Sequence, residues 1–75
     1  MVRIDLLKQA IDNSGVTMTA LAKNSGIERA TLYNRLNGTG EFTASEIYGL
    51  TGALRLSTDE REHIFFAPEV ESNAT

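Results

Sequence analysis

The chain has 75 residues, a formal net charge of −3 and no cysteine. This length allows one small domain with a limited core, and the lack of thiols excludes disulfide bonds and thiolate metal sites. No apolar run reaches the length of a signal sequence or a membrane-spanning helix, so we expect a cytoplasmic protein.

Charge is unevenly distributed along the chain. Residues 1–38 contain five Lys or Arg side chains against three Asp or Glu, a balance of +2, whereas residues 39–75 contain two against seven, a balance of −5. A polyanionic partner such as nucleic acid would therefore approach the first half of the chain. The overall acidity predicts that this electrostatic attraction is weak.

Apolar spacing predicts a helix near the N-terminus. Ile4, Leu7 and Ile11 recur at helical intervals, and Ser14-Gly15 ends the pattern. Because such a stripe covers one face only, this helix has to pack against others.

Two short helices joined by a glycine-containing turn are predicted between Thr17 and Gly38. Thr17 is a side-chain cap for the first of them, and Gly26 can adopt the left-handed conformation that ends it. Ile27 leads into the second helix, which stops at Asn37-Gly38. This is the layout of a DNA-reading helix-turn-helix, in which the second helix enters the major groove with its N-terminal residues.

Two capping boxes predict where the last two helices begin. Thr43-x-x-Glu46 opens a fourth helix, and Ser57-x-x-Glu60 opens a fifth, which runs through Phe66. The buried stripe of the fourth helix is Ile47, Leu50 and Leu54.

The chain is expected to divide into one domain and a tail. Residues 1–68 form the domain, because Pro68 stops the last helix. Residues 69–75 are polar and acidic, and we expect them to be disordered unless a partner orders them. The predicted fold is therefore all-α, a compact five-helix bundle that contains a helix-turn-helix.

Four stretches of the chain carry characteristic residues at a fixed spacing. They are Thr17-x-x-x-Leu21-Ala22-x-x-x-Gly26-Ile27-x-x-x-Thr31-Leu32, Leu36-Asn37-Gly38, Phe42-Thr43-x-x-Glu46-Ile47 and Ile64-Phe65-Phe66. In these stretches the chain resembles the small phage and prophage repressor and Cro-like DNA-binding proteins. The resemblance covers roughly residues 3–68 and implies a lambda-repressor-like fold. It also implies a transcriptional regulator that reads operator DNA in a bacterial host cell or a phage-infected cell.

The outer side of the second motif helix is the candidate DNA-reading surface. Arg29 can bond bidentately to guanine, Asn34 can bond to adenine, and Ala30 can touch a thymine methyl group. At about 100° per residue, Ala30 and Asn34 point away from the leucine stripe of this helix. Arg29 lies nearer that stripe. The alternative to base contact is that Arg29 is an ordinary surface arginine, paired with Glu28. The resemblance implies base contacts from Glu28, Arg29, Ala30 and Asn34.

The resemblance also implies phosphate contacts, from Thr17, Met18, Tyr33, Asn37 and Thr39. Met18 stands where relatives often carry Gln, and its side chain cannot donate, so backbone N–H groups would have to replace that contact. Tyr33 has the alternative of supporting the preceding helix, and Asn37 and Thr39 are also ordinary turn formers.

Catalytic chemistry has no support in the sequence. His63 is the single histidine and lies among acidic residues on a predicted surface helix, with neither a nucleophile nor metal ligands at plausible spacing. We therefore expect no enzyme activity, no cofactor and no metal site.

The predicted function is sequence-specific regulation of transcription, with double-stranded operator DNA as the partner and no membrane association. Symmetric operators imply a homodimer, at least on DNA, and residues 42–66 offer the surface for it. The alternative is a protein-binding module of the same fold, an anti-repressor or regulator partner with little or no DNA binding, whose acidic C-terminal half holds another regulator.

Overall fold

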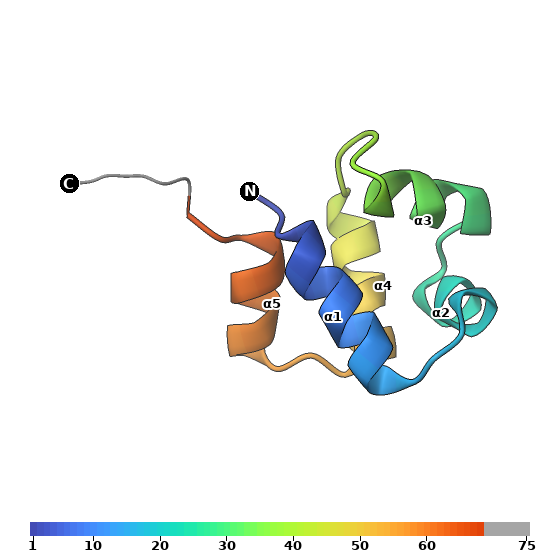
Figure 1. Cartoon of the computed structure of the whole chain (residues 1–75), viewed down its shortest axis with the longest axis horizontal. Coiled ribbons are helices and arrows are strands. Elements are labelled where there is room, and N and C mark those ends of the chain that lie inside the picture. Colours follow the sequence, from blue (N-terminus) through green and yellow to red (C-terminus); the bar gives the residue numbers. More distant parts are fainter. Residues whose placement is uncertain (69–75) are drawn as a thin grey trace.

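A computed structural model describes residues 1–68, and within them the chain forms five α-helices and no strand (Figure 1). The helices are α1 (Ile4–Ser14), α2 (Met18–Ser25), α3 (Arg29–Leu36), α4 (Ala44–Leu54) and α5 (Thr58–Phe65). The predicted all-helical bundle is thus confirmed, although α5 ends one residue earlier than the sequence predicts. The acidic tail predicted for residues 69–75 lies outside the described residues. No helix in the described part is long and apolar enough to cross a membrane.

The helices are arranged around α1 and α4, which occupy the middle of the view in Figure 1. α5 lies on one side of this pair, and α2 and α3 lie on the other. α4 packs against both α1 and α2, while α1 packs against α5. The backbone N–H of Arg3 donates to the carbonyl oxygen of Ile64 at 2.7 Å, which ties the start of the chain to α5. The arrangement leaves α3 on the side of the molecule away from α5.

The core is formed by apolar side chains from all five helices. Four leucines, one from each of the first four helices, are completely buried: Leu7, Leu21, Leu32 and Leu50. α5 contributes Ile64 and Phe65. The remaining buried apolar side chains are Ile11, Ala22, Ile27 and Leu36. Burial of each leucine stabilises the fold by roughly 1.5–3 kcal/mol, so the helix-turn-helix is held in place mainly by packing.

Local hydrogen bonds define where three of the helices begin. The Thr17 hydroxyl accepts from a backbone N–H of the first turn of α2 at 3.1 Å. Both predicted capping boxes are present, with the Thr43 and Ser57 hydroxyls accepting from the N–H groups of Glu46 and Glu60 at 3.2 and 3.1 Å. Each such cap contributes about 1 kcal/mol.

The two glycines of α4 play different structural roles. A Cβ added at Gly49 would collide with the carbonyl oxygen of Ser25, the last residue of α2, whereas one added at Gly52 would meet no atom within 4 Å. Gly49 therefore permits the close approach of α2 to α4. From the sequence alone, both glycines represent only a loss of helix stability, of about 1 kcal/mol each.

Candidate nucleic-acid interface

Helix α3 has one side in the core and one side open to solvent. Leu32 and Leu36 are buried, whereas Arg29, Ala30 and Asn34 are exposed. The helical spacing in the sequence therefore identified the outer surface correctly, and Arg29 joins that surface despite its position nearer the leucine stripe.

Glu28 occupies the N-cap position of α3 but its side chain makes no capping hydrogen bond. The carboxylate is exposed, and it forms no ion pair with Arg29 in the described part of the chain. Glu28 is therefore a negative charge at the start of the helix, where the helix dipole favours it. The Glu28–Arg29 ion pair, which the sequence offered as the alternative for Arg29, is therefore not formed.

Arg29 is instead held by an aromatic ring one turn further along the helix. Its guanidinium carbon lies 5.7 Å from the centroid of the Tyr33 ring, within the range of a cation–π contact. Tyr33 is 42% exposed, so the pair stands on the surface of α3. Such a contact at an exposed site contributes about 0.5–1 kcal/mol and reduces the freedom of the long arginine side chain. The structure thus places Tyr33 beside Arg29, a contact that the sequence did not suggest.

Arg35 does not point freely towards solvent, because it links α3 to the start of α4. Its Nε donates to Glu46 Oε1 at 3.1 Å and its second terminal nitrogen to Glu46 Oε2 at 3.4 Å. The two side chains are only 20% and 15% exposed. Arg35 also donates to the carbonyl oxygen of Thr39 at 3.4 Å, and Glu46 accepts from the backbone N–H of Thr43 at 3.0 Å. This network holds both ends of the loop that follows α3.

That network was not foreseen from the sequence. The capping box revealed that Glu46 begins a helix, but no local pattern relates Glu46 to a residue 11 positions earlier. Among the positive charges of residues 1–38, Arg35 is therefore neutralised inside the protein. The positive charge that remains on the outer surface of α3 comes from Arg29.

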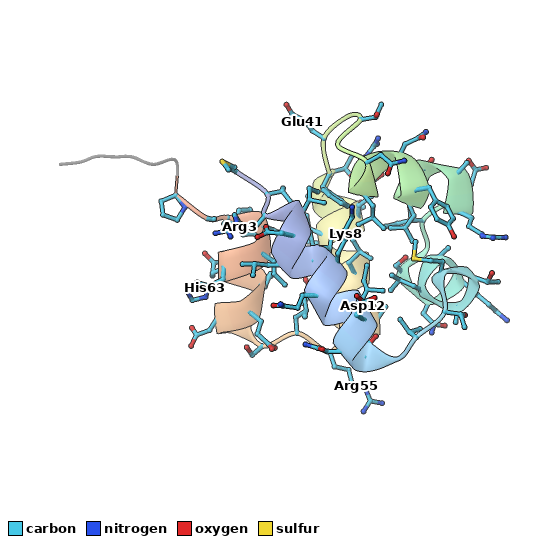
Figure 2. The ribbon with its side chains drawn as sticks, in the orientation of Figure 1. Arg3, Lys8, Asp12, Glu41, Arg55 and His63 are labelled. Carbon is cyan, nitrogen blue, oxygen red and sulfur yellow. The ribbon has the colours of Figure 1, made fainter. Side chains whose placement is uncertain are left out.

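The loop after α3 is tightly folded by its backbone. The N–H of Thr39 donates to the carbonyl oxygen of Asn34 at 2.9 Å, and the N–H of Gly38 donates to that of Arg35 at 3.0 Å. Gly38 and Gly40 have φ angles of 88° and 77°, in the left-handed region that favours glycine. The side chains of Asn37 and Thr39 are exposed at the beginning of this loop, as a phosphate contact requires. Figure 2 shows Glu41 further along the same loop, pointing outwards.

The start of α2 supplies the other pair of predicted phosphate-contacting residues. Thr17 is exposed and its oxygen is occupied as a cap, which leaves the hydroxyl proton free to be donated. Met18 is partly buried and its side chain packs against the core. Only the backbone N–H of Met18 could therefore reach a phosphate. Apart from Tyr33 on α3, the candidate phosphate contacts therefore come from two segments, the start of α2 and the loop after α3.

His63 and the Arg3–Asp5 pair lie outside the candidate DNA-binding surface. His63 is on α5, on the side of the molecule away from α3, where its Nδ1 is 2.7 Å from the carbonyl oxygen of Asp59 (Figure 2). Within residues 1–68, no three His, Asp or Glu side chains are grouped so that they could hold a metal ion.

Near the N-terminus, Arg3 donates two hydrogen bonds to Asp5, at 3.1 and 2.8 Å. These bonds hold the pKa of the Asp5 carboxyl below its ordinary value and raise the pKa of Arg3.

Comparison with known protein families identifies the class of the protein. The family model described as helix-turn-helix, of the Cro/C1 type, matches residues 7–61, and the chain belongs to this family. The match spans α2, α3 and α4 together with most of α1 and the first half of α5. The protein is thus a DNA-binding helix-turn-helix protein. No curated protein and no solved structure shows a significant match to the chain.

Proposed function

We propose that the protein is a sequence-specific transcriptional regulator, a repressor or Cro-like protein of phage or prophage origin, that reads operator DNA in the major groove with α3. The observation that carries this proposal is the outer surface of α3, where Arg29, Ala30 and Asn34 are exposed and Arg29 is supported by Tyr33. A groove-reading helix requires this combination of an anchored inner side and an open outer side.

Each exposed residue of α3 has a chemical role in this proposal. Arg29 donates two bonds to guanine O6 and N7, and Asn34 exchanges two bonds with adenine N6 and N7. Ala30 touches a thymine methyl group, while Glu28 accepts from cytosine N4. A correct bidentate pair discriminates against the wrong base by roughly 1–3 kcal/mol, so Arg29 and Asn34 dominate the specificity.

The residues around α3 position the helix on the DNA backbone. Asn37 and Thr39 contact phosphates from the loop after α3, and Thr17 and the backbone of Met18 do so from the start of α2. The Tyr33 hydroxyl reaches a phosphate beside the Arg29 contact. Such contacts set the register of the protein on the duplex and contain no sequence information.

The oligomeric form of the proposal is a homodimer, at least on DNA, in the cytoplasm of a bacterial or phage-infected cell. A dimer of helix-turn-helix domains reads two half-sites about one helical turn, roughly 34 Å, apart. The operator is then pseudo-palindromic, because the two protein copies are related by a two-fold axis.

Selection of bound sequences from a random pool of double-stranded DNA tests the proposal. We expect an enriched pseudo-palindrome, and a footprint with two protected half-sites on one face of the duplex. Asn34→Ala is expected to relax the preference at one A·T pair in each half-site, and Thr58→Ala, an exposed change on α5, serves as the matched control. No enrichment at about 50 mM salt, where phosphate contacts are strong, would refute DNA reading.

The acidic C-terminal half supports a second candidate, a protein-binding module with little DNA binding. Glu41, Asp59, Glu60 and Glu62 are all exposed in residues 39–68. Retention of the purified protein on DNA that decreases as salt rises favours the regulator. Failure to bind any DNA, together with co-purification of a second regulatory protein, favours the module.

A further inference from the structure

Arg29 is the first residue of α3, where the helix dipole disfavours a positive charge. Its guanidinium forms no ion pair and no hydrogen bond within residues 1–68. It nevertheless has one defined neighbour, the ring of Tyr33, whose centroid lies 5.7 Å from the guanidinium carbon. The ring therefore stabilises a cation at a position that the helix itself makes unfavourable.

We propose that Tyr33 is a positioning residue for base recognition, whose ring sets the direction in which the Arg29 guanidinium extends from α3. The inference rests on the proposed function, in which Arg29 reads a guanine. It gives the ring of Tyr33 a part in sequence specificity. That part is separate from the phosphate contact of the Tyr33 hydroxyl, which contains no sequence information.

The geometry of α3 brings the two side chains together. Residues four positions apart lie on the same face of a helix, and a helical side chain leans towards the N-terminus. The Tyr33 ring therefore covers the turn that begins with Arg29. Leu32 and Leu36 are buried in the core, which fixes the rotation of α3 about its own axis. The ring thus stands at a defined place beside the surface that is proposed to face DNA.

The contact with the ring leaves the donors of Arg29 available. An aromatic ring attracts the flat face of a guanidinium, whereas the five N–H groups point outwards from its edge. A bidentate bond to guanine O6 and N7 uses two of these groups. Arg35 is the contrasting case in α3, because its donors are bound by Glu46 and by the carbonyl oxygen of Thr39. Arg29 combines a defined location with unused donors.

Positioning affects affinity because arginine has a long side chain that loses its free rotation when it binds. A ring that already restricts the guanidinium in the free protein reduces this loss. A cation–π contact at an exposed site corresponds to about a two- to fivefold change in an equilibrium constant. We therefore expect removal of the ring to weaken operator binding by this factor, provided that residue 29 is arginine.

A double-mutant cycle on a duplex with one selected half-site tests the inference. Tyr33→Leu removes the ring, whereas Tyr33→Phe keeps the ring and removes only the hydroxyl. The loss of affinity caused by Tyr33→Leu should be about two- to fivefold greater in the original protein than in Arg29→Ala. Tyr33→Phe should cause the same loss in both backgrounds. Tyr33→Leu should also relax the preference at the G·C pair that Arg29→Ala affects, which loss of a phosphate contact does not do.

Nuclear magnetic resonance of the free protein provides a second measurement, which does not depend on DNA. The ring current of Tyr33 shifts the side-chain proton signals of Arg29. In Tyr33→Leu these signals should move towards those of a freely exposed arginine. In Tyr33→Phe they should stay close to their positions in the original protein.

The matched control is Tyr48→Leu, the same change at a second exposed tyrosine. Tyr48 is 71% exposed and lies in the groove between the beginning of α4 and the end of α5. The groove is lined by residues outside α3, namely Ala44, Ile47, Tyr48, Arg61, Glu62 and Phe66. Tyr48→Leu should therefore leave the half-site affinity, the base preference and the Arg29 signals unchanged. Melting curves show which variants are folded.

The outcomes separate this inference from the proposed function. Equal losses from Tyr33→Leu in the original protein and in Arg29→Ala, with the selected motif intact, would refute the positioning role and leave the proposed function standing. Equal losses from Tyr33→Phe and Tyr33→Leu would refute it as well, because the hydroxyl alone would then account for the effect. Arg29 signals that do not move in Tyr33→Leu would overturn the contact itself. If the original protein prefers no DNA sequence, the proposed function is wrong and the positioning role is wrong with it, whatever the spectra show.

Discussion

The outer surface of α3 and the groove between α4 and α5 differ in chemistry although the same small core supports both. On α3 the exposed groups are polar or small, with one cation held over an aromatic ring. In the groove, two exposed aromatic side chains stand beside a cation and an anion. A polar surface suits the wet major groove, whereas an aromatic surface with balanced charge suits another protein surface. One 75-residue chain can therefore present two distinct interfaces.

The two regions also differ in how they are attached to α4. The helix-turn-helix contacts α4 closely, at Gly49 beside Ser25 and through the Arg35–Glu46 pair. α5 is held mainly by α1, and Phe65 packs edge-to-face on Phe42 with ring centroids 5.5 Å apart. We therefore expect changes on the inner side of α4 to damage DNA reading, and changes in the groove to spare reading of a single half-site.

Gly49→Ala is expected to have the largest effect. Its Cβ would collide with the Ser25 carbonyl oxygen, so α2 has to move away from α4. We expect a loss of about 3 kcal/mol or more in the free energy of unfolding. Gly52→Ala, in the same helix with open space around it, should instead stabilise the protein by up to about 1 kcal/mol. Equal effects of the two changes on urea unfolding would show that α2 is not seated on α4 as described.

Arg29→Ala tests the outer surface of α3. We expect a loss of about 1–3 kcal/mol in binding to the preferred operator and a relaxed preference at one G·C pair, with little change in melting temperature. Asn37→Ala should weaken binding to all sequences alike, since it removes a phosphate contact. Binding titrations on the selected operator and on point-substituted operators measure both effects. If Arg29→Ala leaves affinity and the selected motif intact, Arg29 does not read a base.

Arg35→Met tests the connection between the two regions. Because both partners are largely buried, we expect a loss of about 1–2 kcal/mol in stability from the hydrogen bonds to Glu46. The loop after α3 should also lose its anchor, so affinity should decrease uniformly across operators without a change in the preferred motif. Arg3→Met is the control, since its ion pair is exposed to solvent. A changed base preference in Arg35→Met would show that Arg35 reads DNA directly.

The Arg3–Asp5 pair should produce the smallest effect, and only at low pH. Arg3 holds the pKa of Asp5 below its ordinary value of 3.8 in the folded protein, so this pair stabilises the fold above that pH. The contribution disappears as the pH falls below 3.8 and through the folded pKa. Between pH 5 and pH 2, the melting temperature should therefore decrease slightly more for the original protein than for Asp5→Asn. The difference should vanish in about 1 M salt, which screens exposed charges.

The sequence predicted the helices well because their signals are local. The capping residues Thr17, Thr43 and Ser57 act on N–H groups within three positions of themselves, and apolar spacing identified the buried sides of α1, α3 and α4. The same spacing placed Ala30 and Asn34 on the outer side of α3. The assignment of particular base and phosphate contacts remains a prediction, because it depends on DNA.

Tertiary structure alone decided which distant residues meet. Gly49 lies against Ser25, Arg35 pairs with Glu46, and the groove joins residues of α4 to residues of α5. Each of these contacts depends on how whole helices pack, and many packings are compatible with one pattern of apolar residues. The sequence by itself therefore determined the helices, the buried sides of α1, α3 and α4, and the presence of a helix-turn-helix. The packing of the core decided that Arg35 is bound by Glu46 within the protein, and that an aromatic groove remains open on the other side of the molecule.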